Sequence, residues 1–167
     1  MTDRPFLDAY SGQSTDELIA LDGTYRTDSI VLAFEQAIGQ KAARIGDQRL
    51  TMAERVVLAV EALEREVNND GYDGLFRNAP EHVPDLASAL TAIGRDDVAS
   101  LTRSAIDVLG VDDPLTPTAI HAAIEIDNDE RDARLSELDE TYYETAGDLA
   151  GPLIAFIVAN SAEIELP

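Results

Sequence analysis

Residues 51–68, TMAERVVLAVEALEREVN, carry the clearest structural signal in the chain. Thr51 and Glu54 match a capping box, in which each side chain accepts a hydrogen bond from a backbone N–H that the start of a helix leaves free. The apolar positions that follow recur at the helical period and form one stripe: Met52, Val56, Val60, Leu63 and Val67. We therefore predict an amphipathic helix from Met52 to about Asn68, with Glu54 facing away from the core.

The same kind of start and stop signal recurs in the rest of the sequence, whereas the alternation typical of strands is scarce. About nine short helices joined by tight turns are predicted: one after Thr15, then 28–44, 52–68, 72–76, 84–93, 96–110, 117–126, 129–145 and 148–160. No linker, repeat or low-complexity segment interrupts them. We expect an all-α fold and a single compact domain over residues 1–167.

Composition sets limits on the class of protein. The chain has 167 residues, 45% of them hydrophobic, which suffices for a core, and it has no Cys for disulfides or thiolate metal sites. The longest apolar run, Leu153–Ala159, is much shorter than the roughly 20 residues of a membrane span. The first residues lack the pattern of a signal peptide. We expect a cytoplasmic protein without membrane association.

Acidic residues dominate the charge. The sequence has 33 Asp and Glu against 12 Lys and Arg, a net charge of -21, and Lys41 is its single lysine. Such a surface repels the phosphates of nucleic acids and attracts basic partners. Direct binding of nucleic acid is therefore not expected.

Catalytic groups are sparse. His82 stands beside Glu81 and Asp85 in a predicted loop, where solvation is the simplest interpretation, and His121 is expected to be a partly buried structural residue of a helix. No glycine-rich phosphate loop is present. We expect no enzyme, no cofactor and no metal site, with a carboxylate enzyme that uses a divalent metal as the remaining alternative.

The excess of negative charge is concentrated in the final third. Residues 111–167 have 14 acidic and 2 basic residues, a net of -12. On the predicted helix 129–145, Leu135, Leu138 and Tyr142 form the stripe that should face the core. Carboxylates three or four residues apart lie about 5–6 Å apart at Cβ, comparable to neighbouring phosphates of a strand, although like charges so close oppose helix stability. The predicted partner-binding residues are Asp127, Asp129, Glu130, Asp132, Glu137, Asp139, Glu140 and Glu144.

A second explanation of the acidity is solvation. A protein from a high-salt cytoplasm has abundant Asp and Glu and almost no Lys, as here. Salt adaptation, however, should decorate every exposed helix, whereas this sequence places most of the excess near one end. Both explanations stay open at the level of sequence.

Residues 64–78, EREVNNDGYDGLFRN, form an unusual run that we call the corner motif. Asn69 and Gly71 suit the turn conformations that end a helix. Tyr72 and Phe76, four residues apart, should pack into the core, while buried Asn amides tie the turn to nearby carbonyls. The residues predicted to build this corner are Glu66, Asn68, Asn69, Gly71, Tyr72, Phe76 and Asn78.

The corner motif resembles the signature of a small bacterial family of DNA-mimic proteins, in which a helix ends in Glu-x-Val-Asn-Asn-Gly-Gly-aromatic and a Phe and an Asn follow. Residues 92–94 and the later Leu138-Asp-x-x-Tyr142-Tyr143 are also similar to that family, so the resemblance spans about residues 50–160. Asp70 departs from the pattern, because the family commonly has Gly there. This adds a charge at the turn.

The resemblance implies an all-α fold, often a homodimer, whose carboxylates imitate the phosphates of a duplex. It implies a basic DNA-binding protein as partner, such as a helix-turn-helix transcription regulator that the decoy keeps from its operator. The alternative is an interaction or immunity-type protein that binds through an apolar groove or dimer surface, its acidity serving solvation in high salt.

Overall fold

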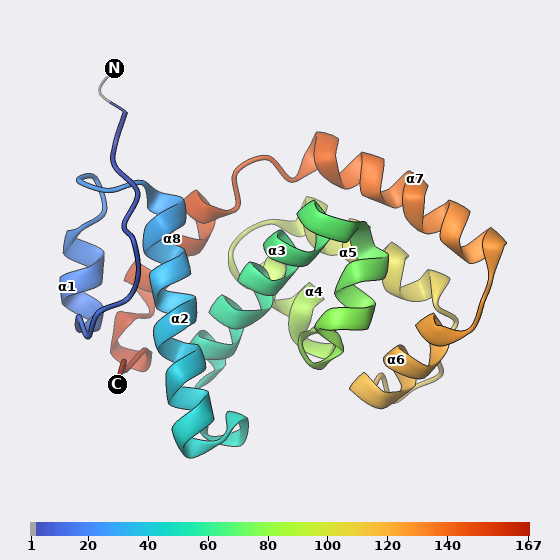
Figure 1. Ribbon diagram of the computed structural model, residues 1–167, viewed down its shortest axis with the longest axis horizontal. Coiled ribbons are helices and arrows are strands. Elements are labelled where there is room, and N and C mark those ends of the chain that lie inside the picture. The colour runs from blue at the N-terminus through green and yellow to red at the C-terminus, as the bar shows by residue number, and fades with distance from the viewer. Residues whose placement is uncertain (1–2) are drawn as a thin grey trace. The chain divides into compact units, whose positions relative to one another are not determined.

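Helices provide almost all the regular structure of the computed structural model, which describes residues 3–167 (Figure 1). The α-helices are α1 (Thr15–Ala20), α2 (Thr27–Ile45), α3 (Met52–Asn78), α4 (Val83–Ala92), α5 (Asp96–Val108), α6 (Pro117–Glu125), α7 (Asp129–Thr145) and α8 (Ala150–Ala159). Three 3-10 helices connect or follow them: η1 (Asp47–Arg49), η2 (Pro80–His82) and η3 (Ser161–Glu163). Within residues 3–167 there is no β-strand, so the predicted all-α class is confirmed.

Residues 3–167 form eight α-helices where about nine helices were expected. The difference lies in α3, which contains both of the predicted helices 52–68 and 72–76. The two segments are joined by a kink at Asp70 and Gly71. The backbone of these two residues is not helical. The two segments were therefore correctly predicted, and their separation was overestimated.

The chain forms two compact units. Unit 1 consists of residues 1–61 and 148–167, and unit 2 consists of residues 62–147. Helix α3 contributes its first part to unit 1 and the rest to unit 2. The single domain expected over residues 1–167 stays a prediction.

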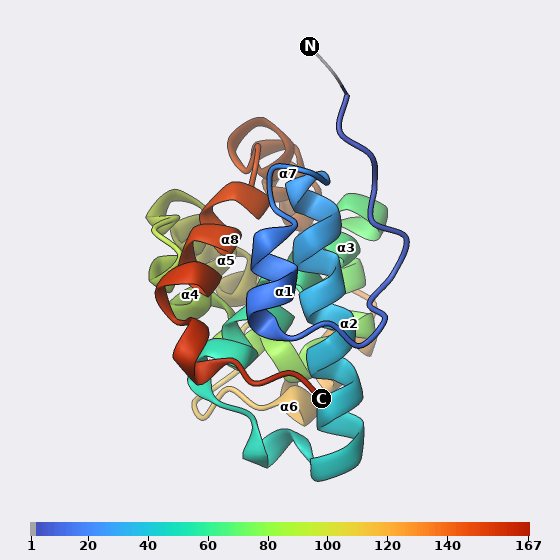
Figure 2. The same ribbon diagram turned by 90° about the vertical axis from the view of Figure 1, so that its left-hand side faces the viewer.

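In unit 1, helix α2 packs against α1 and α8 (Figures 1 and 2). Leu18 of α1, Phe34 of α2 and Leu153 of α8 are completely buried in its core. After η3 the chain runs back along α2, where Lys41 Nζ donates a hydrogen bond to the carbonyl of Glu165 (2.8 Å). Tyr10 Oη donates to the carbonyl of Pro167 (3.0 Å).

The first turn of α3 corrects two expectations. The capping box is present, since Thr51 N–H donates to Glu54 Oε2 (3.0 Å) and Glu54 N–H donates to Thr51 Oγ1 (3.1 Å). Glu54, however, is fully buried and Met52 is 72% exposed, the reverse of the prediction. Residues two apart on a helix point to nearly opposite sides, so only one of the two can face the core. Here Glu54 faces the core and Met52 faces solvent. Glu54 Oε1 also accepts from Lys41 Nζ (2.6 Å) and from the backbone N–H of Glu165 (3.1 Å).

Unit 2 contains the end of α3 and helices α4 to α7. Helix α5 packs against both α4 and α7, and α6 packs against η2. The buried side chains include Leu63 and Val67 of the predicted stripe, together with Leu86, Leu90 and Ile120. Helix α7 runs along the upper side of this unit in Figure 1.

Candidate functional site

Helix α7 begins and ends where the sequence predicted, at Asp129 and Thr145. Asn128 caps its start, because the side-chain Oδ1 accepts a hydrogen bond from the Arg131 N–H (3.0 Å). Asp129, Glu130 and Asp132 stand in the first turn, where the positive end of the helix dipole favours negative side chains. The cap and the dipole thus partly offset the repulsion among the carboxylates of this helix.

The core side of α7 is narrow. Of its 17 residues only Arg131, Leu135 and Tyr142 are buried, and Leu138 of the predicted stripe is half-buried. Two fully buried apolar side chains are a small anchor for a helix of almost five turns. Polar contacts at its start, middle and end supply the remaining attachment.

At the start, Arg131 reaches from α7 to the last carbonyls of α6. Its Nη1 donates to the carbonyl oxygens of Ala123 and Ile126, both at 2.8 Å. Carbonyls at the C-terminus of a helix lack partners within the helix, and a cation there also interacts favourably with the dipole. Asp132 neutralises the same guanidinium at 2.7 Å. Burial of Arg131 was not predicted, although its helical position beside Leu135 and Tyr142 on the core side is a signal for it.

At the end of α7, Arg95 acts in a similar way. Its Nη1 donates to the carbonyl of Ala146 (2.7 Å) and its Nη2 to the carbonyl of Thr145 (3.0 Å). Asp97 binds the same guanidinium at 3.0 Å, and this hydrogen bond, as the main cause, lowers the pKa of Asp97. The sequence pattern did not indicate this role of Arg95, because its two partners lie 50 and 51 residues away.

In the middle, three side chains of α7 attach to the corner motif of α3. Asp139 Oδ1 accepts a hydrogen bond from the Tyr72 N–H (2.8 Å). Tyr142 Oη donates to Glu64 Oε1 (2.7 Å), and Tyr143 Oη donates to the carbonyl of Val67 (2.8 Å). We call these three contacts of Asp139, Tyr142 and Tyr143 the α7 clamp.

The corner motif itself is a structural turn, with one correction. Tyr72 and Phe76 are fully buried and their rings stack with centroids 6.2 Å apart, as the spacing predicted. Asn68 and Asn69 are exposed, so the prediction of buried amides is wrong. Asn68 Nδ2 donates to the carbonyl of Glu64 (2.7 Å) and to its Oε2 (3.5 Å), one turn earlier on the same helix.

Further along the motif, Asn78 Nδ2 donates to Glu66 Oε2 (3.0 Å) and joins the two limbs of the kink.

Burial changes the pKa of the clamp residues. It is the main cause that raises the pKa of the Asp139 carboxyl, with a smaller contribution from nearby Asp73, while the Tyr72 N–H acts in the opposite direction. Burial also raises the pKa of the Tyr142 hydroxyl, and the carboxylate of Glu64 that it contacts adds to this effect. The hydroxyl of Tyr142 therefore stays protonated at neutral pH and serves as a donor.

Opposite the core side, five carboxylates of α7 share one side of the helix. At 100° per residue they fall within an arc of about 100°, centred away from Leu135 and Tyr142. All five are exposed, and among the described residues none of them forms an ion pair. We call this set the acidic face; it consists of Asp129, Glu130, Glu137, Glu140 and Glu144.

Three of the predicted partner-binding residues lie outside the acidic face. Asp127 is exposed in the loop before α7. Asp132 turns to Arg131, and Asp139 points into the corner. Asp132 pairs with the adjacent Arg131 of the same helix, whereas the partner of Asp139 is a distant residue of α3 that the sequence pattern did not reveal.

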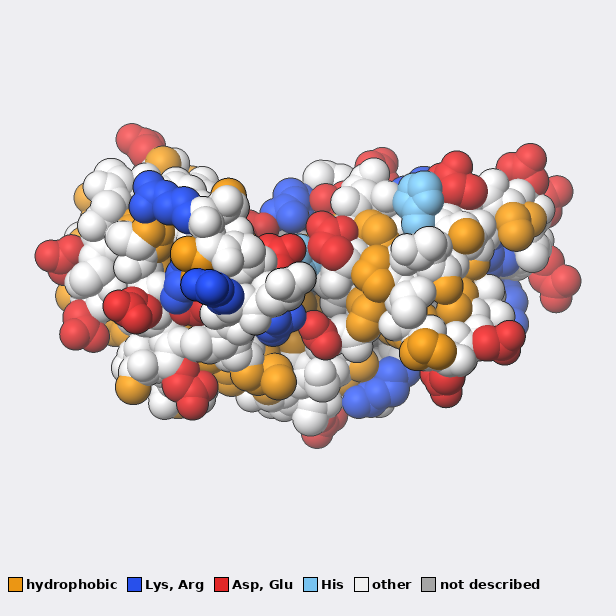
Figure 3. Space-filling view, turned by 90° about the horizontal axis from the view of Figure 1, so that it is seen from below, with side chains coloured by type: hydrophobic (Ala, Val, Ile, Leu, Met, Phe, Trp, Pro, Cys, Tyr) orange, Lys and Arg blue, Asp and Glu red, His pale blue; other side chains and the backbone are white. Residues whose placement is uncertain are grey.

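The two units differ in charge. Unit 2 has 20 acidic and 6 basic residues, a net of -14, whereas unit 1 has 13 and 6, a net of -7. Figure 3 views unit 2 in its right-hand part from the side away from α7, where apolar side chains gather in the middle and carboxylates stand mostly at the rim. On this face, carboxylates are thus fewer in the middle than at the rim.

The two histidines take no part in a cluster. His82 lies in η2, 3.7 Å from Glu81. His121 is exposed rather than partly buried as predicted, because α6 turns its neighbour Ile120 inward instead. Among residues 3–167, no group of three or more His, Asp or Glu is arranged to hold a metal ion. None of the helices in this range has both the length and the apolar character that a membrane crossing requires.

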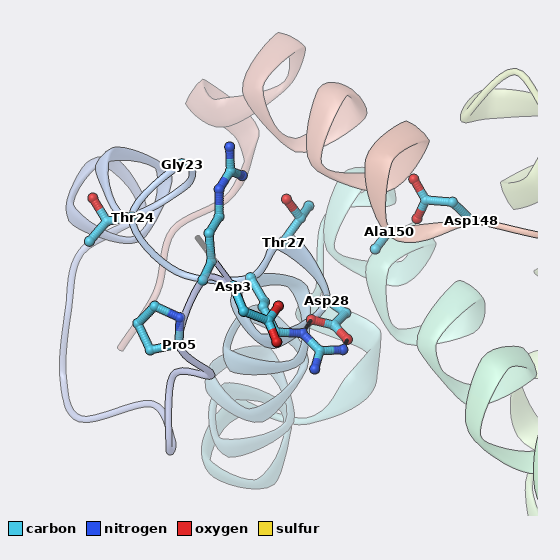
Figure 4. A pocket seen from close by; sticks show the side chains of 10 residues that line it. Asp3, Pro5, Gly23, Thr24, Thr27, Asp28, Asp148 and Ala150 are labelled. Atoms are coloured by element: carbon cyan, nitrogen blue, oxygen red, sulfur yellow. Dashed lines mark hydrogen bonds and ion pairs between the residues drawn. The ribbon is translucent and has the colours of Figure 1, made fainter. Parts of the chain in front are cut away.

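An open pocket of about 940 Å³ lies in unit 1 beside the start of α2 (Figure 4). Its charged lining is mixed, with Asp3, Asp28 and Asp148 against Arg4 and Arg26. Two of these groups already pair with each other, since Arg26 Nη2 lies 2.5 Å from Asp28 Oδ2. The balance of charge favours neither an anionic nor a cationic ligand.

Comparison with known proteins gives one match. The sequence model of the family described as DMP19-like protein matches residues 48–160, about two thirds of the chain. The matched region contains the corner motif, the α7 clamp and the acidic face. No curated protein and no solved structure matches the chain.

Proposed function

Because the chain belongs to the DMP19-like family, a family of DNA-mimic type, we propose that it is a non-catalytic decoy for a DNA-binding protein. In this proposal the acidic face of α7 occupies the DNA-binding surface of a transcription regulator and prevents operator binding. The partner is a basic protein, for instance of the helix-turn-helix type, and the decoy itself does not contact nucleic acid.

The observation that carries the proposal is the unpaired row of carboxylates on one side of α7. From Asp129 to Glu144 the row extends about 22 Å, at 1.5 Å per residue. One strand of B-DNA spaces its phosphates 3.4 Å apart along the axis, so the row covers about six of them. A regulator that reads DNA presents Lys and Arg to phosphates over such lengths. The acidic face offers those cations a set of negative groups on a rigid support.

Electrostatic attraction also determines how the complex should respond to salt. Exposed charges are screened beyond about 8 Å at physiological ionic strength. Charge complementarity mainly raises the rate of association, which falls steeply as salt is added. The affinity of the proposed complex should therefore decrease strongly between low and high salt.

A neutralised variant provides the test. In it, Asp129 becomes Asn and the four glutamates of the acidic face become Gln, which lowers the net charge from -21 to -16. The parent chain, immobilised at low salt, should retain a DNA-binding regulator from a lysate of the source cells. That regulator, once purified, should lose its operator in a mobility-shift assay when the parent is added. The neutralised variant should fail in both assays.

Unit 1 offers a matched control. Five of its exposed carboxylates form no side-chain hydrogen bond or ion pair within the described residues: Asp8, Asp16, Asp47, Glu163 and Glu165. Their replacement by Asn and Gln gives the same net charge of -16 without touching α7. Full operator release by this control and none by the neutralised variant would support the decoy. If the neutralised variant and the unit 1 control lost the same amount of operator release, the effect would depend on net charge alone, which would contradict the proposal.

A second candidate function rests on the place of the single lysine. Lys41 is held between Glu54 and the carbonyl of Glu165, so lysine occurs only where it has a structural partner. A surface otherwise free of lysine suits solvation in high salt, and the partner would then bind through an apolar surface. In that case the neutralised variant would keep its partner, while an increase in salt would leave the affinity unchanged or raise it.

A further inference from the structure

The acidic face points outward only if α7 keeps one rotation about its own axis. Apolar burial fixes this rotation weakly, because Leu135 and Tyr142 are its only fully buried apolar side chains. A turn of one residue moves each side chain by about 100°. Such a turn would carry carboxylates toward the corner motif and would leave part of the acidic face covered.

We infer that the α7 clamp sets this rotation, and that Asp139, Tyr142 and Tyr143 are positioning residues for the acidic face. The inference rests on the proposed function for its biological meaning, and on the geometry of unit 2 for its mechanism. It assigns the corner motif a role as the anchor of the acidic helix rather than as a partner-binding surface.

The positions of the three residues support this role. At 100° per residue, Tyr142 points to the middle of the core side, while Asp139 and Tyr143 stand about 60° and 100° to one side of it. Each binds a different point of α3: the Tyr72 N–H, the Glu64 carboxylate and the Val67 carbonyl. Three directional bonds to three fixed points define a rotation more sharply than apolar contact, which has no direction.

The close contact between Gly71 and Asp139 also restricts the rotation of α7. A Cβ atom on Gly71 would overlap the carboxylate of Asp139, so this carboxylate lies directly against the backbone of the kink. Gly71 has a φ of 71°, a left-handed conformation that glycine adopts without strain. Because residue 71 has no side chain, the Asp139 carboxylate of α7 can occupy the space beside the kink.

The absence of cysteine allows a direct measurement of the rotation. Ser104 of α5 and Ser136 of α7 are both exposed, and replacement of each by Cys allows two spin labels to be attached within unit 2. The labelled parent should give one narrow distance distribution. Removal of two ties by Tyr143→Phe and Asp139→Ala should broaden it or add a second distance. Amide exchange of residues 139–145 should become about fivefold faster for each hydrogen bond removed.

Tyr10→Phe is the matched control, because it removes a tyrosine hydroxyl bond in unit 1 and leaves unit 2 untouched. It should change neither the distances nor the exchange of α7. If the double variant loses its fold, the single Tyr143→Phe is used instead, since this side chain is half exposed and its ring remains. An unchanged distance distribution and unchanged exchange in the folded variant would overturn the inference.

A binding assay separates position from charge. Tyr143→Phe keeps the net charge of -21, so a decaarginine peptide should bind this variant as well as it binds the parent. The regulator captured by the parent should bind it several-fold more weakly. Equal binding of the regulator by parent and variant would contradict the role of Tyr143.

The distance measurement needs no partner and tests the clamp alone. If the neutralised variant still released operator DNA from the regulator, the proposed decoy function would be contradicted. The measured effect of the α7 clamp on the rotation of α7 would remain valid.

Discussion

The carboxylate of Asp139 occupies the space that a side chain at Gly71 would need. The two residues are 68 positions apart, in α7 and at the kink of α3, and the adjacent Tyr72 N–H donates to the same carboxylate. This pairing joins the corner motif to the acidic helix. Substitution of either Gly71 or Asp139 should therefore disturb the packing of α7 on the corner motif.

Replacement of Gly71 by Ala should destabilise the protein by about 2 kcal/mol or more. A non-glycine residue pays about 1–3 kcal/mol for a backbone with φ 71° and ψ -170°, and the overlap with Asp139 adds to this cost. Urea denaturation measures the change. In the double variant with Asp139→Ala, the loss should be less than the sum of the two single losses, because the overlap is gone. Strict additivity would show that the two residues do not interact.

The raised pKa of Asp139 predicts a dependence of stability on pH. Since burial favours the protonated form in the folded state, this residue contributes most stability below its unfolded pKa of about 3.9, and the contribution is lost as pH rises through the higher folded pKa. Asp139→Asn keeps an acceptor for the Tyr72 N–H without the charge. The variant should therefore be at least as stable as the parent at pH 7, and its advantage should shrink toward pH 4. Denaturation curves of both proteins at the two pH values test this, and a constant difference would contradict it.

Glu54→Ala should cost about 3 kcal/mol, because it removes the buried acceptor of Lys41 and of two backbone N–H groups. Met52→Gln, two residues earlier on the exposed side, should change stability by less than about 0.5 kcal/mol. Thermal and urea denaturation of the two variants compare them directly. Similar losses of stability in the two variants would show that the buried contacts of Glu54 do not stabilise the fold.

Arg131→Met should destabilise unit 2 by about 2 kcal/mol, since the buried guanidinium that donates to the part-buried carbonyls of Ala123 and Ile126 is removed. Arg134→Met on the exposed side of the same helix is the control and should have an effect within about 0.5 kcal/mol. Hydrogen exchange should locate the damage at the C-terminus of α6. Protection there that stays at the parental level would contradict this role of Arg131.

Local sequence patterns predicted most of the helices, and their failures have local causes. The bounds of α7 and the capping box at Thr51 followed from period and spacing. At α1 the cap is Ser14 with Glu17, so the helix begins at Thr15 and not after it as predicted. Thr15 is buried and donates its hydroxyl to the carbonyl of Ile164, 149 residues away. Such a partner is invisible to a pattern read over four residues.

The candidate site was predictable in outline for the same reason. Of the eight carboxylates predicted for the site, the structure exposes seven and leaves Asp139 half-buried; their part in binding a partner stays a prediction. The role of Asp132 depends on the inward orientation of Arg131, and that of Asp139 on the kink of α3, and the helical period of α7 indicates neither partner. Burial of Arg131 and Glu54 also escaped prediction, because a charged residue enters a core only where several distant partners meet it.

The acidic face has a consequence for how such a protein can change over generations. Its five side chains contact solvent, while the ties that hold α7 come from other positions on the helix. Substitutions on the outer side can therefore alter which molecule is recognised without disturbing the support beneath. Substitutions on this surface can give a lineage new targets while the corner motif is inherited unaltered.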